Sequence, residues 1–412
     1  MNTERTISWN AVPDFDKADL GLERMRCVNT RLYTGTLSPE SGAFSLHPHI
    51  AFFNGILYAA WSVHYGDEDS PGQYVRYAFS TDLGESWSES RVLFEPMEHP
   101  LRNSDEKDAD GNRIQGHRPH DACGSGNKSE LPWLNDSCSY YHLMLCSNGF
   151  AVAGGELYAI AEAATVVNRG IGRLARRISA DGKHGAVMWL NDDFPDIKTL
   201  NPHAINTELY NNSGFERKRV EEIIEYLRDS RHMPQWDMMY PGWRQYDGKT
   251  AGEWGSEFAK THSGGCGEPT YSYVAADGAY MRLWRNNEGV QHTHFSLDRG
   301  LSWSEIINSS YPETGARTSV TNLPDGSVCL IGNPGVKRMQ LCISVSRDGY
   351  GFTKNAVLRC EPPLMKHRGR AKGTGFHYPH CTVAGDYLFV VYSVNKEDID
   401  VSKIRLEDLY IQ

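Results

Sequence analysis

The sequence lacks the long apolar and basic segments that are typical of membrane and nucleic-acid-binding proteins. Its 412 residues contain no run of 18 apolar residues, so we predict no membrane-spanning helix. The formal net charge is -10, and no run of basic residues is available to neutralise a phosphate backbone. We therefore expect neither a membrane nor a nucleic acid as partner, and an anionic ligand would need a local pocket of Arg and His side chains.

Short metal and cofactor motifs are also missing. The 9 cysteines include no Cys-x-x-Cys pair, which argues against a disulfide framework and a zinc ribbon. There is no His-Glu-x-x-His, EF-hand loop, phosphate-binding glycine loop or Gly-x-Ser-x-Gly elbow. His117, His120 and Cys123 lie close together and offer part of a zinc site. We expect no cofactor, with a structural divalent metal as the alternative.

The N-terminal residues 1–6 lack the basic and apolar regions of a signal peptide. A complete chain of this kind is expected to be cytoplasmic, whereas a chain whose signal peptide was removed is expected to be secreted or periplasmic. With 40% hydrophobic residues, the chain is able to bury a large core, and we expect a soluble monomer.

What the sequence does contain is a repeat. Residues 80–87 read Ser-Thr-Asp-Leu-Gly-Glu-Ser-Trp, and residues 296–303 read Ser-Leu-Asp-Arg-Gly-Leu-Ser-Trp. Looser copies begin at Ser346 and Ser179. Each full copy follows an alternating polar and apolar run, which predicts a hairpin. In that hairpin the Asp accepts hydrogen bonds from turn amides, the Gly avoids a clash, and the Trp fills the gap between neighbouring sheets.

The spacing of the repeat predicts a β-propeller. Ser296 and Ser346 are 50 residues apart, and the 216 residues from Ser80 to Ser296 divide into four steps of 54, about the length of a four-stranded blade. We predict seven blades, or six larger ones, in a single all-β domain over residues 1–412. A strand near residues 26–33 is expected to close the ring.

Two insertions interrupt the repeat, near residues 95–137 and 210–260. Within the second, residues 215–229 place apolar side chains on one face at helical spacing, which predicts a helix on the outside of the propeller. That helix is expected to carry no chemistry.

Polar residues recur where the inner strand of each blade is predicted to begin. In a propeller these strand ends converge around the central channel, so residues distant in sequence become neighbours. The catalytic candidates are His120, His142, His203, Tyr141, Tyr378 and His380. The substrate-binding candidates are Arg244, Arg317, Trp243, Tyr240, Tyr271 and His49. The alternative is that these side chains only form hydrogen bonds between neighbouring blades.

Arginine is the residue type that best binds a carboxylate, because its guanidinium donates two parallel hydrogen bonds. Arg244 and Arg317 are the first candidates, and Arg118, Arg282 and Arg285 rank behind them. Aromatic residues around Arg244 offer a stacking platform for a sugar ring.

The eight-residue repeat resembles the Asp box of sialidase-like β-propellers. A sialidase is expected to open its first blade with Arg-Ile-Pro and to use an arginine triad and a tyrosine nucleophile served by a glutamate. Residues 46–49 of this chain read Leu-His-Pro-His at that opening. The His-rich blade openings and the Tyr-Pro-His run at residues 378–380 are similar instead to propeller enzymes that act on L-rhamnose linked α-1,4 to D-glucuronate. That group includes lyases and α-L-rhamnosidases.

The second resemblance implies a β-elimination. An arginine, Arg244 or Arg317, would hold the uronate carboxylate, and a histidine would remove the C5 proton while Tyr141 or Tyr378 protonates the departing O4. Hydrolysis usually needs two carboxyl groups, and Glu268 is the main acidic residue at the blade openings. We therefore predict a lyase acting on an acidic oligo- or polysaccharide. The alternatives are an exo-α-L-rhamnosidase and a non-catalytic glycan-binding propeller.

Overall fold

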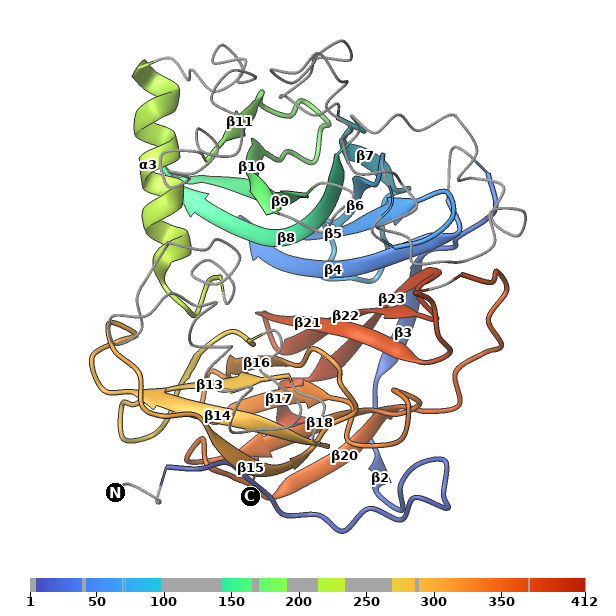
Figure 1. The fold of residues 1–412 in the computed structure, drawn as a ribbon, viewed down its shortest axis with the longest axis vertical. Helices are drawn as coiled ribbons and strands as arrows, with labels where there is room; N and C mark the ends of the chain where they lie inside the picture. Colours follow the sequence, from blue (N-terminus) through green and yellow to red (C-terminus); the bar gives the residue numbers. More distant parts are fainter. Residues whose placement is uncertain are drawn as a thin grey trace, which may run out of the picture.

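The computed structural model describes residues 5–38, 42–68, 70, 72–97, 143–164, 170–190, 214–233, 269–285, 289–369 and 371–411. These residues fold into mainly antiparallel sheets that pack on one another (Figure 1). The predicted all-β propeller architecture is confirmed. No helix in the described ranges is long and apolar enough to cross a membrane.

Four-stranded sheets follow one another along the chain, each with its strands in sequence order. The first two sheets consist of β4 (Phe44–Phe53), β5 (Ile56–His64), β6 (Tyr74–Ser80) and β7 (Arg91–Phe94), then β8 (Met144–Ala153), β9 (Glu156–Ala164), β10 (Gly170–Arg177) and β11 (Val187–Trp189). The third sheet consists of β12 (Tyr273–Val274), β13 (Tyr280–Trp284), β14 (Val290–Ser296) and β15 (Ile307–Pro312).

Two further sheets incorporate strands from the N-terminus. The fourth consists of β16 (Ser319–Asn322), β17 (Val328–Gly332), β18 (Leu341–Ser346), β20 (Lys354–Arg359) and β2 (Glu23–Arg24). The fifth consists of β21 (Phe376–Ala384), β22 (Tyr387–Val394), β23 (Asp398–Arg405) and β3 (Val28–Tyr33). The predicted strand near residues 26–33 is present as β3, which pairs antiparallel with β23. A separate two-stranded pairing joins β1 (Ser8–Trp9) to β19 (Gly351–Phe352).

The inner strands order the sheets around the centre. β4 lies against both β8 and β21, β21 lies against β16, and β16 lies against β12. Residues 191–213 and 234–268, between the second and third sheets in sequence, lie outside the described residues. Seven blades, with six as the alternative, therefore stay a prediction.

The predicted even step of 54 residues between successive copies of the repeat does not hold between the first two sheets. The loose copy that begins at Ser179 lies between β10 and β11, so it belongs to the sheet next to the one that carries the copy beginning at Ser80. These two copies are one sheet apart, yet nearly twice the predicted step of 54 residues separates them. The long connection between β7 and β8 causes the difference, because extra residues in a connection lengthen the sequence without adding a blade.

The eight-residue turns have the predicted geometry. Asp82 accepts hydrogen bonds from the Ser86 amide (3.0 Å) and the Ser86 hydroxyl (2.5 Å), which together lower the pKa of the Asp82 carboxyl to about 2. Gly84 has φ +78, and a Cβ there would lie 2.6 Å from the ring of Phe389 in the neighbouring sheet. The turns therefore fix both the hairpin and the contact between blades.

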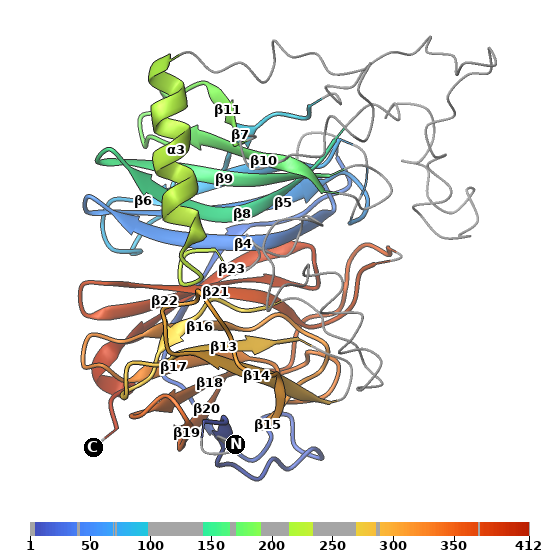
Figure 2. The same ribbon diagram turned by 60° about the vertical axis from the view of Figure 1, so that its left-hand side comes forward.

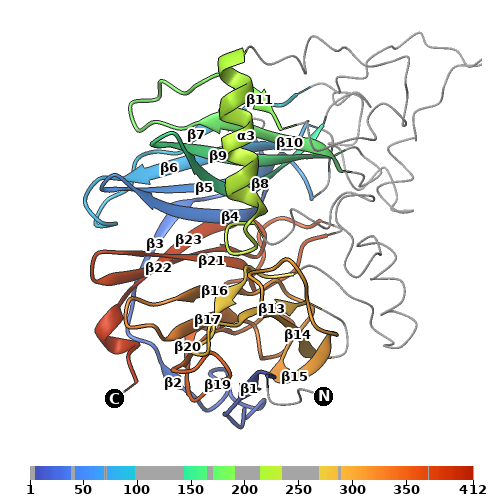
Figure 3. The same cartoon turned by 90° about the vertical axis from the view of Figure 1, so that its left-hand side faces the viewer.

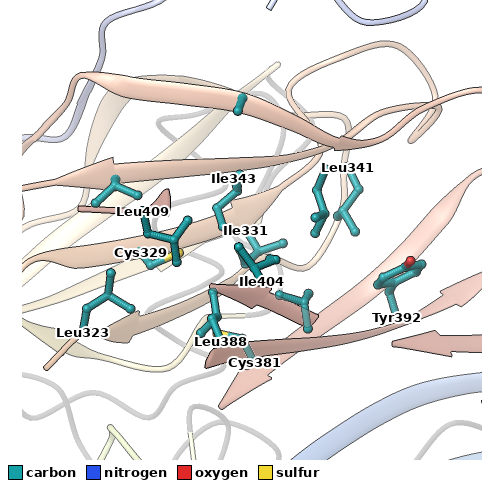
Figure 4. Close-up of a cluster of buried hydrophobic side chains, with 14 of the residues drawn as sticks. Leu323, Cys329, Ile331, Leu341, Ile343, Cys381, Leu388, Tyr392, Ile404 and Leu409 are labelled. Atoms are coloured by element: carbon teal, nitrogen blue, oxygen red, sulfur yellow. The ribbon is translucent and has the colours of Figure 1, made fainter. Parts of the chain in front are cut away.

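The predicted helix over residues 215–229 is confirmed as α3 (Gly214–Arg228). Its apolar side chains Val220, Ile223, Ile224 and Leu227 are buried against the second sheet. Figures 2 and 3 show the helix standing across the ends of β8, β9 and β10. The faces of the sheets pack on one another in the same apolar way. Figure 4 shows one such cluster, in which Leu323, Cys329 and Ile343 of the fourth sheet meet Cys381 and Leu388 of the fifth.

Candidate active site

The inner strands β4 and β21 are interrupted by the same two-residue bulge. The pairing register shifts between Leu46 and His49 in β4 and between His377 and His380 in β21. Each bulge contains a proline. Because proline has no amide hydrogen, the loss of strand pairing at that residue leaves no backbone donor without an acceptor. The residue before each proline is in the left-handed region, which costs on the order of 1–3 kcal/mol for a side chain of this size. These residues are His47 (φ +53) and Tyr378 (φ +50).

Tyr378 is surrounded by guanidinium groups. Arg285, directly after β13, donates a hydrogen bond from Nη1 to the Tyr378 hydroxyl at 3.0 Å. The Cζ atoms of Arg338 and Arg317 lie 5.5 and 5.9 Å from the centre of the Tyr378 ring. Arg317 precedes β16, and Arg338 lies in the connection between β17 and β18. Three segments that are distant in sequence thus bring positive charge to one phenol.

Arg317 differs from the other two arginines in its surroundings. Its side chain is buried, with 9% of the residue exposed, and its Nε has no hydrogen-bond acceptor in the described part of the chain. No carboxylate contacts it in the part of the chain that the structure describes. Arg338, by contrast, donates to the Gly315 carbonyl at 2.5 Å and contacts His377 Nδ1 at 3.0 Å. An unpaired buried charge is costly, so Arg317 is the arginine best prepared to receive an anion.

His47 completes this arrangement. Its imidazole stacks on the ring of Tyr378 with centroids 5.5 Å apart, and its Nε2 lies 3.7 Å from a carboxylate oxygen of Glu68. Glu68 also pairs with Lys396. Burial, together with the nearby charges of Arg317 and Lys396, lowers the pKa of His47 well below its usual value, so the ring is neutral at pH 7. We call Arg285, Arg317, Arg338, Tyr378 and His47 the tyrosine–arginine cluster.

A second group of polar residues lies two positions further along the inner strands. The ring of His380 is 4.9 Å from that of His49 and 5.0 Å from that of Tyr271. His49 donates from Nδ1 to the His47 carbonyl at 3.1 Å, and His380 Nδ1 accepts from the Ile50 amide at 3.2 Å. We call His49, Tyr271 and His380 the histidine layer.

The histidine layer is uncharged. Burial lowers the pKa of His380 to about 3 and that of His49 well below its usual value, and Arg317 adds to both effects. Burial also raises the pKa of Tyr271. A catalytic base is most effective with a pKa near the working pH, so these values argue against the catalytic role predicted for His380.

The structure separates the predicted site residues into two groups. Tyr378 and Arg317 belong to the tyrosine–arginine cluster, and His49, Tyr271 and His380 belong to the histidine layer. The remaining candidates lie outside the described residues: His120, His142, His203, Tyr141, Arg244, Trp243 and Tyr240. The partial zinc site at His117, His120 and Cys123 also lies outside them. Within the described ranges no group of three or more His, Cys, Asp or Glu side chains is arranged to hold a metal.

Sequence reasoning missed Arg338 and Glu68 and ranked Arg285 too low. Arg285 directly follows the mainly apolar run of residues 279–284, which is a signal that its side chain lies at the end of a strand. Arg282, ranked equally, is fully buried inside the third sheet, where its guanidinium lies 4.3 Å from the ring of Trp303. Arg282 therefore packs a blade and does not reach the cluster.

Comparisons with known proteins agree with this architecture. Residues 232–390 match the BNR repeat-like domain. A solved sialidase superposes with a TM-score of 0.71 and 22% sequence identity, over 97% of this chain and 35% of that chain. The fold is that of a sialidase-like β-propeller. This chain spans about a third of the length of that sialidase.

Two further solved structures related to sialidases align over most of this chain at lower TM-scores. Trypanosoma rangeli sialidase matches with a TM-score of 0.49 and 10% identity, over 93% of this chain and 60% of that chain. The intramolecular trans-sialidase from Ruminococcus gnavus matches with a TM-score of 0.45 and 14% identity, over 96% of this chain and 99% of that chain. No curated protein matches the chain.

Proposed function

We propose that the protein is a carbohydrate-active enzyme that acts on a glycan with a carboxylate-bearing sugar, and that the tyrosine–arginine cluster is its active site. The observation that carries this proposal is Arg317, a buried arginine whose Nε has no acceptor among the described residues and whose Cζ lies 5.9 Å from the centre of the Tyr378 ring. A sugar carboxylate supplies the two acceptor oxygens that a guanidinium binds best. The sialidase-like fold supports a glycan as the substrate.

Tyr378 is the group proposed to react. Its oxygen accepts a hydrogen bond from Arg285, and a positive donor of this kind stabilises the phenolate over the phenol. The phenolate is both a nucleophile and a base. Glu68, whose side chain is 12% exposed, has an oxygen 3.7 Å from His47 Nε2 and is the carboxylate proposed to take up the Tyr378 phenol proton as the phenolate forms.

Hydrolysis is the reaction that we favour. It uses a nucleophile with a neighbouring carboxyl group, and Tyr378 and Glu68 supply these, whereas the described histidines are poor bases for removing a carbon-bound proton. The second candidate is β-elimination at a terminal L-rhamnose-α-1,4-D-glucuronate linkage. It is favoured by the position of Arg317, which would neutralise the uronate carboxylate next to Tyr378. The Tyr378 phenolate would accept the C5 proton, and the phenol so formed would protonate the departing O4 as the C4–O4 bond breaks.

One assay separates the candidates. The protein is incubated with sialylated, glucuronate-containing and rhamnose-capped glucuronate glycans, and the products are followed as released sugar and as absorbance at about 235 nm, where the unsaturated uronate formed by elimination absorbs. Release without absorbance supports hydrolysis, and release with absorbance supports elimination. Binding without release on every glycan would contradict the enzyme and favour a glycan-binding propeller.

Arg317→Met is expected to lower kcat/KM for the carboxylate substrate by about 10²–10³-fold, as for loss of a charged contact in a desolvated site. The same substrate with its carboxylate converted to the methyl ester should be turned over equally by both proteins, because the guanidinium then has no charge to bind. Arg299→Met, at an exposed arginine of an eight-residue turn, is the control and should leave both rates unchanged. If Arg317→Met lowered kcat/KM equally for the carboxylate substrate and for its methyl ester, Arg317 would not be the residue that binds the carboxylate.

A further inference from the structure

A cavity of about 250 Å³ lies at the other end of the inner strands. β4 and β21 begin at the tyrosine–arginine cluster and run toward the turns that lead into β5 and β22. The cavity is lined by the later residues of these strands, including Ile50 and Thr382, together with residues of β8 and β16 and the end of α3. The histidine layer therefore separates this cavity from the proposed active site.

One wall of the cavity is apolar and partly open to solvent. It is formed by Ile50, Phe52, Phe150 and Val152. Phe52 and Val152 are 38% and 37% exposed, so this wall includes apolar surface that water reaches. A ligand that covers them removes apolar surface from water, which favours binding.

The floor of the cavity carries hydrogen-bonding groups without partners. His380 accepts from the Ile50 amide at Nδ1, so its single proton is on Nε2. Neither this Nε2–H nor the hydroxyls of Tyr271 and Thr382 meets a hydrogen-bond partner in the described ranges. Two residues of β21 and Tyr271, which precedes β12, thus present polar groups to one small space.

The charges around the cavity are already paired. Arg231 is bound by both oxygens of Asp229, at 3.0 Å from Nε and 2.5 Å from Nη2. His380 and Tyr271 are neutral at pH 7, as described above. The opposite wall is the stacked pair of Tyr226 and His232, with ring centroids 3.9 Å apart. An uncharged ligand therefore fits this lining better than an anion.

We propose that this cavity binds one neutral sugar residue, which makes it a second glycan-binding site on the face opposite the active site. A sugar ring has an apolar face of C–H groups for the wall at Phe52 and Val152, and hydroxyls for His380, Tyr271 and Thr382. The volume suits a single ring, because pockets for larger ligands run to about 300–1,000 Å³. The choice of a sugar rests on the proposed function as a glycan-active enzyme.

Binding is tested on the full chain with methyl glycosides of glucose, rhamnose and N-acetylglucosamine, and with methyl glucuronide as the anionic comparison. Saturation-transfer NMR and calorimetry are expected to detect at least one neutral glycoside with a Kd of about 1 mM, near −4 kcal/mol. Val152→Trp, which fills the mouth of the cavity, should weaken that binding at least about tenfold. Val187→Trp is the matched control, since Val187 is also 37% exposed, lies in the same sheet and does not line the cavity.

The proposal is overturned if no neutral glycoside binds, or if binding survives Val152→Trp unchanged but is lost in Arg317→Met, which would place the sugar in the active site. The two proposals fail independently. If Val152→Trp abolishes neutral-sugar binding while Arg317→Met leaves turnover of the carboxylate substrate unchanged, the second site stands and the proposed active site falls.

Discussion

At the scale of single residues, two bulges decide where the chemistry lies. The sequence analysis expects His49 and His380 to become neighbours although they are distant in sequence, and their rings lie 4.9 Å apart. The division into a cluster and a layer is not visible in the sequence, because it depends on a loss of strand pairing that turns His47 and Tyr378 away from their neighbours. In a strand with regular alternation, His47 and His49 would point to the same face of the sheet, and so would Tyr378 and His380.

The buried histidines predict a dependence of stability on pH. The pKa of His49 in the folded protein lies well below its value of about 6.5 in the unfolded chain. Below pH 6.5, His49 therefore binds a proton in the unfolded chain and stays unprotonated in the folded protein. The contribution of the neutral His49 to the unfolding free energy is therefore fully present above about pH 6.5, and it is lost as the pH falls below that value. His49→Gln should reduce the slope of unfolding free energy against pH by about 1.4 kcal/mol per pH unit between pH 6 and pH 5.

Urea unfolding from pH 9 to pH 5 measures this slope. Above pH 7.5 the wild type and the variant should run parallel, which provides the internal control. Curves that stay parallel down to pH 5 would show that His49 takes up its proton in the folded protein.

At the scale of elements, the eight-residue turns are the feature that the sequence predicts best. Their Ser, Asp and Gly side chains interact within a few residues, so the pattern is enough to place a hairpin between the third and fourth strands of a blade. Helix α3 is equally local and was predicted to within a residue. The length of the connections between blades is not encoded by any periodicity, which is why the predicted even spacing failed.

Two glycines at the same position of two turns test how the turns join the blades. Both have positive φ, +78 at Gly84 and +89 at Gly300, so alanine strains the backbone at each. Only at Gly84 does the added Cβ meet a neighbouring blade, 2.6 Å from the ring of Phe389; at Gly300 the nearest atoms lie at 3.4 Å. Gly84→Ala should cost about 3 kcal/mol of unfolding free energy and Gly300→Ala about 1 kcal/mol, measured by urea unfolding. Equal losses would mean that backbone strain alone sets the cost.

At the scale of the whole molecule, the N-terminal segment joins sheets that are built from the C-terminal half of the chain. β1 pairs with β19, β2 with β20 and β3 with β23, and the Trp9 indole donates to the Ser344 hydroxyl at 3.0 Å. The sequence predicts this closure from the repeat, because an open ring would leave sheet edges exposed. It cannot predict the number of blades, since insertions of different length satisfy the same chain length.

Removal of residues 1–34 is expected to open the ring at β23. That strand would lose its pairing with β3, and Asp398 and Asp400 would lose their ion pairs with Arg31, so two carboxylates that are 5% and 7% exposed would be left near an open apolar edge. The truncated protein should lose its single cooperative thermal transition and associate in size-exclusion chromatography, as exposed edge strands do. A peptide of residues 22–36 added in excess should restore the transition, whereas a scrambled peptide of the same composition should not. A truncated protein that stays monomeric and unfolds at the wild-type temperature would show that the ring is held closed by contacts between the blades and does not depend on its closing strand.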